Sequence, residues 1–209
     1  MKILLEESSR GESLLITLNL IANNDTIKPL IPIFADGVVF LYPVFLVLWY
    51  LLGGYIVQKS HKKYAILTFL GVIASILITL FIQQFVDKAR PENFLNQDML
   101  VLKHFPSISF PSDHATVGFA MAFGIIRSWS KLKNKWIKIS WYIFLILAVL
   151  MGLARIGAWV HWPTDIVAGM VVALLWVELV FKNEDILAKF VNFLIWLEEK
   201  VLGIVFQRF

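Results

Sequence analysis

Five long apolar stretches constrain the fold of this 209-residue chain more than any other feature of its sequence. A segment needs about 20 consecutive apolar residues to cross the hydrocarbon core of a bilayer. The stretches that meet this length lie at about Ile33–Val57, Tyr64–Phe85, Pro111–Trp129, Ile137–Ala158 and Trp162–Phe181. Because a segment in lipid must satisfy its own backbone hydrogen bonds, each stretch is expected to form a helix. The sequence therefore predicts an all-α integral membrane protein.

Composition supports this class. Hydrophobic residues make up 59% of the chain, which would leave a water-soluble domain too little polar surface. The lack of cysteine excludes disulfides and thiolate metal sites. The N-terminus, which includes Glu6, Glu7 and Arg10, lacks the basic and then apolar order of a cleavable signal peptide. Membrane insertion is therefore expected to depend on the spans themselves.

Both ends of the chain are expected to lie at the membrane surface. Leu14–Ala22 is apolar but too short to span, and Asn19 interrupts it. Asp185–Phe209 mixes apolar and charged residues and indicates an amphipathic helix, with a sixth span as the alternative. We therefore expect five to six membrane-spanning helices and amphipathic terminal helices in a single domain, residues 1–209. Its parts are an interfacial lead (1–30), a helical bundle (31–182) and a C-terminal amphipathic helix (183–209).

Basic loops indicate which end of the bundle faces the cytoplasm. Lys59, Lys62 and Lys63 lie between the first two spans, and Arg127–Lys138, between the third and fourth, is also rich in lysine. These loops are on one side of a five-span topology, and their positive charge marks that side as cytoplasmic. The charge-balanced loop 86–110 then lies outside. We expect an integral protein of a bacterial plasma membrane.

Three polar segments reach the outer side of this topology. Arg90-Pro91 follows the second span, Pro111–His114 opens the third, and Arg155–Asp165 joins the fourth to the fifth. Charged residues at such positions are costly to keep and are usually functional. Since all three segments emerge on one face, we expect them to converge on a single site.

Arg90, Ser112 and Arg155 are the main candidate phosphate ligands, and Gln83 and Asp113 are also counted among the phosphate-binding residues. A guanidinium presents a planar fork of donors that matches phosphate oxygens, and two of them can hold one phosphoryl group from two sides. Pro111 suits the first turn of a helix. The free N–H groups of that turn, with the Ser112 hydroxyl, form an anion site. This pattern favours a phosphate-containing substrate.

His161, Asp165 and His114 are the candidate catalytic residues. His161 and Asp165 are four positions apart and share a face of a helical turn. The carboxylate can fix the tautomer of His161 and leave its other ring nitrogen as a nucleophile. His114 is then available to protonate the leaving oxygen. The chain has 4 histidines and no H-E-x-x-H motif, so we expect no metal cofactor.

The three segments resemble the motifs of the type 2 phosphatidic acid phosphatase superfamily, K-x6-R-P, P-S-G-H and S-R-x5-H-x3-D. Here they read Gln83…Arg90-Pro91, Pro111-Ser112-Asp113-His114 and Ala154-Arg155…His161…Asp165. The resemblance covers roughly residues 30–182 and is greatest to the bacitracin-resistance branch, the undecaprenyl-diphosphate phosphatases. It implies a phosphatidic-acid-phosphatase-type helical bundle and a metal-independent phosphohistidine mechanism. The implied nucleophile is His161, with Asp165 as its orienting group, His114 as acid, and Arg90, Ser112 and Arg155 on the phosphate.

Three residues depart from the family pattern. Gln83 replaces the lysine of the first motif, keeping a donor without the charge. Lys88 is near it in sequence but on a different helical face, and we do not expect it to substitute. Asp113 replaces the glycine beside the phosphate turn and is expected to point away from the phosphate or to meet a cation. Ala154 lacks the hydroxyl of the third-motif serine.

The leading hypothesis is a membrane phosphatase that converts undecaprenyl diphosphate to undecaprenyl phosphate and phosphate at the outer leaflet. The alternative within the class is a phosphatidate or phosphatidylglycerophosphate phosphatase. An alternative of another class, suggested by Gln83 and Ala154, is a non-catalytic lipid-binding or transport protein of the same architecture. The expected partners are the membrane and a lipid phosphate, not nucleic acid, and the sequence does not indicate an oligomeric state.

Overall fold

The computed structural model describes residues 13–94, 101–102 and 108–206, and within these ranges the protein is helical, without strands. His104 of the outer loop and the N-terminal residues Glu6, Glu7 and Arg10 lie outside the described residues. Four described segments are long and apolar enough to cross a membrane: Lys28–Gly54, Ser60–Gln83, Lys135–Gly157 and Pro163–Lys182. The expected all-α membrane fold is therefore confirmed.

The first span is built from short pieces. It consists of η1 (Lys28–Leu30), α2 (Ile31–Ala35), η2 (Gly37–Phe40), α3 (Leu41–Leu48) and the π-helical η3 (Trp49–Val57). Pro29, Pro32 and Pro43 fall within these pieces. Because proline has no N–H and clashes with the preceding turn, it prevents one regular α-helix. Asp36 lies at the break between α2 and η2, which places a charged residue inside an otherwise apolar segment.

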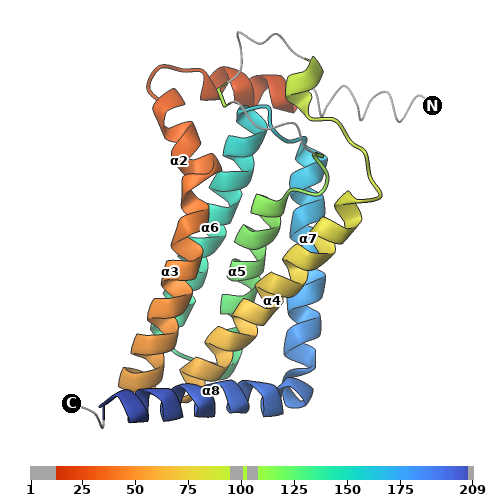
Figure 1. Cartoon of the computed structure of the whole chain (residues 1–209). Helices are drawn as coiled ribbons and strands as arrows, with labels where there is room; N and C mark the ends of the chain where they lie inside the picture. Colours follow the sequence, from red (N-terminus) through yellow and green to blue (C-terminus); the bar gives the residue numbers. More distant parts are fainter. Residues whose placement is uncertain (1–12, 95–100, 103–107, 207–209) are drawn as a thin grey trace.

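The other bundle helices are α4 (Ser60–Gln83), α5 (Asp113–Leu132), α6 (Lys135–Gly157) and α7 (Pro163–Lys182). Figure 1 shows α5 in the middle of the bundle, with α4, α6 and α7 around it. The 20 residues of α5 give it a length of about 30 Å. Its composition is less apolar than that of the four spans above, because much of its surface meets other helices instead of lipid. It carries buried small and polar residues, among them Ala115, Thr116 and Ser128.

One close approach between α5 and α7 positions the polar end of the bundle. A Cβ added at Gly169 would lie 2.8 Å from the Ser112 carbonyl oxygen and 3.0 Å from the Thr116 hydroxyl. Glycine is therefore needed for the first turns of the two helices to come this close. The backbone N–H of Ser112 also donates to the carbonyl of Asp165 at 3.1 Å. These contacts join the starts of α5 and α7, which carry two of the three sequence motifs.

Helix α8 (Glu184–Phe206) lies across the opposite end of the bundle, at the start of α4 and the end of α7 (Figure 1). Val191 and Ile195 are buried against the bundle. The Lys62 ammonium lies 2.7 Å from Glu198, and that of Lys131 lies 2.9 Å from Glu184. This arrangement fits the expected amphipathic surface helix and not the alternative of a sixth span.

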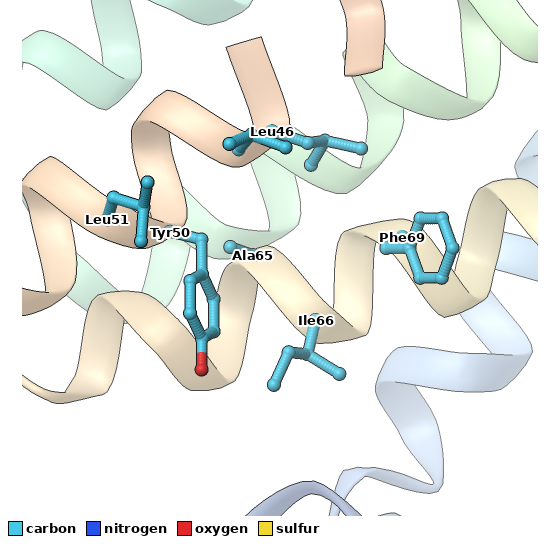
Figure 2. Close-up of a pocket in the computed structure, with 7 residues that line it drawn as sticks. Leu46, Tyr50, Leu51, Ala65, Ile66 and Phe69 are labelled. Carbon is cyan, nitrogen blue, oxygen red and sulfur yellow. The ribbon is translucent and has the colours of Figure 1, made fainter. Parts of the chain in front are cut away.

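Figure 2 shows an apolar pocket between the first span and α4, lined on one side by Leu46, Tyr50 and Leu51. On the other side are Ala65, Ile66 and Phe69, from the part of α4 that is nearer to α8. The charged residues of the three motifs are not among its lining.

At the motif end, the short helix Ser13–Ala22 packs on the end of α6, where Asn19 donates to the carbonyl of Gly157 at 2.8 Å.

Candidate active site

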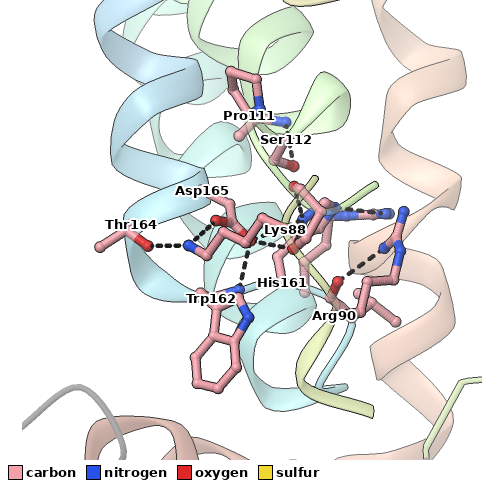
Figure 3. A network of polar contacts seen from close by, with 12 residues as sticks. Lys88, Arg90, Pro111, Ser112, His161, Trp162, Thr164 and Asp165 are labelled. Atoms are coloured by element: carbon pink, nitrogen blue, oxygen red, sulfur yellow. Dashed lines mark hydrogen bonds and ion pairs between the residues drawn. The ribbon is translucent and has the colours of Figure 1, made fainter. Parts of the chain in front are cut away.

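The three sequence motifs converge at the end of the bundle away from α8. Arg90 follows α4, Ser112 caps the start of α5, and Arg155, His161 and Asp165 come from the end of α6 and the start of α7. Figure 3 shows the side chains of Lys88, Arg90, His161 and Asp165 close together at this end. The convergence expected from the topology is therefore present in the structure.

Asp165 is the fixed centre of this cluster. It is fully buried in the first turn of α7, where its Oδ2 accepts the backbone N–H of Trp162 at 2.8 Å. The Ser109 hydroxyl donates to the same oxygen. The Lys88 ammonium lies 2.6 Å from Oδ1 and 2.6 Å from the Thr164 hydroxyl (Figure 3). A carboxylate with this many donors is held in one orientation and kept ionised.

His161 is buried and held by its Nδ1 atom. That nitrogen is 2.9 Å from the Ser109 carbonyl oxygen and 3.5 Å from Oδ2 of Asp165. Since both partners only accept, Nδ1 must carry the proton, and in the neutral ring Nε2 then keeps a lone pair. Burial lowers the pKa of His161 to about 4, so the ring is neutral at pH 7. Ser109 thus shares the orienting task that the sequence assigned to Asp165 alone.

Two buried guanidiniums lie next to this ring. Nη2 of Arg155 is 3.2 Å from Nε2 of His161, and its Nη1 donates to the carbonyl of Ala35 at 3.1 Å and to the carboxylate of Asp36. Nη1 of Arg90 donates to the carbonyl of Val160, the residue before His161, at 2.8 Å. Burial lowers the pKa of Arg90, although a guanidinium remains protonated at any physiological pH. Arg155 is thus within reach of a group bound at Nε2, and Arg90 is held at the backbone next to His161.

The start of α5 brings Ser112, Asp113 and His114 to the same place. The Ser112 hydroxyl is buried and caps the helix by accepting the N–H of Ala115 at 3.4 Å. The Asp113 carboxylate accepts the backbone N–H of His114 at 2.9 Å and lies 3.2 Å from Nδ1 of its ring. Asp113 therefore contacts the imidazole of the candidate acid, His114. Nε2 of His114 is 3.5 Å from the carboxylate of Asp36.

Gln83 and Lys88 differ from their expected places. Gln83 was a candidate phosphate ligand, but its amide donates to the carbonyl of Pro111 at 2.9 Å and so braces the turn before α5. Lys88 was not expected to replace the first-motif lysine, because it was assigned to a different helical face from Gln83. Helix α4 ends at Gln83, however, and the non-helical chain beyond it takes Lys88 to Asp165.

Sequence reasoning missed the parts played by Lys88, Ser109 and Asp36. Only Lys88 left a usable signal, as a cation two residues before the Arg-Pro pair. Among the described residues, no group of three or more histidine and acidic side chains has the spacing of a metal site. The chemistry that the cluster offers is attack by a neutral imidazole on an anion bound by guanidinium groups.

A helical membrane bundle with such an anion site at one end defines the class of membrane lipid phosphatases. The family model of the PAP2 superfamily matches residues 63–185, and the chain belongs to this superfamily. The chain is 28% identical over 162 residues to undecaprenyl-diphosphatase BcrC of Bacillus subtilis (strain 168), covering 77% of this chain and 76% of that protein.

Two solved structures share the fold. The PAP2-type phosphatidylglycerolphosphate phosphatase of Bacillus subtilis superposes with a TM-score of 0.66 at 22% identity, over 86% of this chain and 87% of its own. LpxE of Aquifex aeolicus superposes with a TM-score of 0.62 at 21% identity, over 81% of this chain and 93% of its own. At these identities the comparison supports the bundle architecture and says nothing about the substrate.

Proposed function

We propose that the protein hydrolyses undecaprenyl diphosphate, or a polyprenyl diphosphate of similar kind, to the monophosphate and inorganic phosphate. The observation that carries this proposal is the contact between Nε2 of His161 and the Arg155 guanidinium. This contact supports a nucleophile and an anion-binding group that act at one point, at the end of a membrane bundle. The similarity to undecaprenyl-diphosphatase BcrC supports the choice of substrate.

In the proposed reaction, Nε2 of His161 attacks the terminal phosphorus and the bond to the bridging oxygen breaks. The lipid monophosphate leaves with the electron pair of that bond, and His114 donates a proton to the departing oxygen. Water then attacks the phosphohistidine, with His114 accepting its proton, and releases inorganic phosphate and free His161. Arg90, Arg155 and the turn at Ser112 bind the equatorial oxygens, where charge develops in the transition state.

Asp165 acts in this scheme through His161 and not on the substrate. The attacking imidazole becomes positively charged as the N–P bond forms. A buried carboxylate 3.5 Å from Nδ1 stabilises that charge, and the Ser109 carbonyl keeps the ring in the required tautomer.

We further propose that the site faces the outside of the cell. The basic loops before α4 and between α5 and α6 lie at the α8 end of the bundle. By the positive-inside rule that end is cytoplasmic, so the motif end opens outward. A lipid can then keep its tail in the bilayer while its diphosphate enters between the helix ends.

The decisive experiment measures phosphate release and trapped phosphoenzyme with the purified protein and a polyprenyl diphosphate. His161→Ala is expected to abolish both signals. His114→Ala is expected to slow hydrolysis of the lipid at least 100-fold. With an aryl phosphate, whose leaving group departs without protonation, the hydrolysis rate of the same variant should fall much less. Undiminished hydrolysis by the His161 variant would refute the catalytic role of His161. Absence of phosphate release from any lipid by the wild type would favour a non-catalytic membrane protein.

The same assay distinguishes the substrates. Phosphatidate and phosphatidylglycerophosphate are tested beside the polyprenyl diphosphate at equal surface concentration in mixed micelles. Selective turnover of either glycerolipid would contradict the diphosphate proposal while leaving the reaction class intact.

A further inference from the structure

Asp36 brings a carboxylate to the site from outside the three sequence motifs. It lies at the break between α2 and η2, with its side chain 37% exposed. One of its oxygens, Oδ1, contacts Nη1 of Arg155 and is 3.5 Å from Nε2 of His114. The same Arg155 nitrogen donates to the carbonyl of Ala35, so the end of α2 is held against the site.

The two groups that Asp36 contacts are the ones that a phosphate needs. Arg155 is buried, and its other terminal nitrogen reaches the proposed nucleophile, His161. His114 is the proposed acid. An oxygen that lies between this guanidinium and this imidazole occupies a position suited to a phosphoryl oxygen. Asp36 and a bound phosphate would therefore compete for the same two donors.

The other two carboxylates of the site accept a backbone N–H at the start of their own helix. Asp165 is fully buried and fixed by Lys88, Ser109 and a backbone N–H. Asp113 sits in the first turn of α5 and accepts the backbone N–H of His114. Asp36 lies at a helix break with its side chain 37% exposed, against 48% for Asp113 and 0% for Asp165, so rotation of its side chain can return the carboxylate to water.

We infer that Asp36 is a displaceable internal anion, which orients Arg155 and His114 and yields them to the terminal phosphate of the substrate. This inference rests on the proposed function for the identity of the displacing group. A phosphate carries more charge and more acceptor oxygens than a carboxylate, so it displaces the Asp36 carboxylate from the guanidinium. The competition with Asp36 weakens anion binding and thereby favours release of the product phosphate.

The test is anion affinity and needs no turnover. Orthovanadate and inorganic phosphate are titrated into the purified full-length protein in detergent and binding is followed by calorimetry. Asp36→Asn keeps the size of the side chain and removes its charge. It is expected to bind both anions about tenfold more tightly, which is the effect of one nearby unit charge reduced for partial exposure.

Asp25→Asn is the matched control, because Asp25 is an exposed aspartate in the turn before the first span. Its affinity should equal that of the wild type. Asp36→Ser removes the same charge with a smaller side chain and should reproduce the gain if the asparagine variant does not fold. Unchanged or weaker anion binding in a folded Asp36 variant would overturn the inference. Failure of the wild type to release phosphate from any lipid would instead overturn the proposed function.

Discussion

At the scale of single residues, His161 shows how burial makes an imidazole a nucleophile. Its Nδ1 proton is committed to the Ser109 carbonyl, and burial lowers its pKa to about 4. The unprotonated form therefore predominates at every pH above about 4, whereas an ordinary imidazole is half protonated near pH 6.5. The ring therefore keeps its Nε2 lone pair, which faces the Arg155 guanidinium, at physiological pH.

The pKa of His161 predicts how the rate of the first chemical step falls at low pH. The rate of phosphoenzyme formation in a single turnover should fall by half only as the pH drops to about 4. Measurement between pH 4 and 8, with the ionisation of the substrate followed separately by phosphorus NMR, checks this. A half-loss near pH 6.5 that does not follow the substrate would show that His161 titrates as an exposed histidine.

Lys88 is predicted to act on the rate and not on substrate affinity. Its ammonium lies 2.6 Å from the Asp165 carboxylate, which stands behind His161. Lys88→Met frees that carboxylate to move, and kcat should fall about tenfold because small displacements near the nucleophile are costly. KM should stay within about twofold of the wild type. Steady-state kinetics test this, with the exposed Lys28→Met as control. A raised KM at unchanged kcat would place Lys88 on the substrate phosphate instead.

The sequence predicted the candidate site residues better than it predicted the contacts that support them. Arg90, Arg155, His161 and Asp165 were recognisable because their spacing matches the family motifs and their segments emerge on one side of the topology. The contacts of Ser109 and Asp36 depend on how the loop before α5 and the end of α2 fold over the site, which local patterns do not encode. The predicted position of Lys88 was wrong because helix α4 ends at Gln83 and the chain at Lys88 is not helical.

At the scale of elements, length and hydropathy located the spans to within a few residues. The third expected span, Pro111–Trp129, corresponds to α5, Asp113–Leu132. The first span was less predictable in its internal structure. It begins at Lys28 and not at Ile33, and it is broken into short helical pieces. That break matters, because it places Asp36 at the site.

The contact between α5 and α7 predicts a sensitive glycine. Gly169→Ala adds a methyl group 2.8 Å from the Ser112 carbonyl oxygen, and the two helix starts must separate. We expect a loss of about 1–3 kcal/mol in stability and a reduced kcat, since Ser112 and Asp165 lie on the two helices. Thermal unfolding in detergent and lipid hydrolysis measure the two effects.

Gly37→Ala provides the comparison for this prediction. The nearest atoms to a Cβ at Gly37 are 3.9 Å away, so the added methyl group fits without displacement. Its unfolding temperature should match that of the wild type. Equal stability of the Gly169 and Gly37 variants would show that α5 and α7 can adjust without cost.

At the scale of the whole molecule, the two ends of the bundle are chemically different. One end holds the proposed anion-binding site, with the buried guanidiniums of Arg155 and Arg90. The other carries lysine pairs to α8, such as Lys59 with Glu199 and Lys62 with Glu198. The Lys59 pair is exposed and contributes little to stability, whereas the Lys62 side chain is buried. In the proposed orientation these lysines mark the cytoplasmic end of the bundle, and the phosphatase site lies at the other end.

Cysteine labelling can test this orientation without background, because the chain contains no cysteine. Asp87 is exposed beyond the end of α4, near the site, and Lys135 is exposed at the start of α6, at the end that carries α8. With a membrane-impermeant maleimide on intact cells, Asp87→Cys should be labelled at once. Lys135→Cys should react only after the membrane is opened. The reverse pattern would place the site in the cytoplasm, where a diphosphate in the outer leaflet is out of reach.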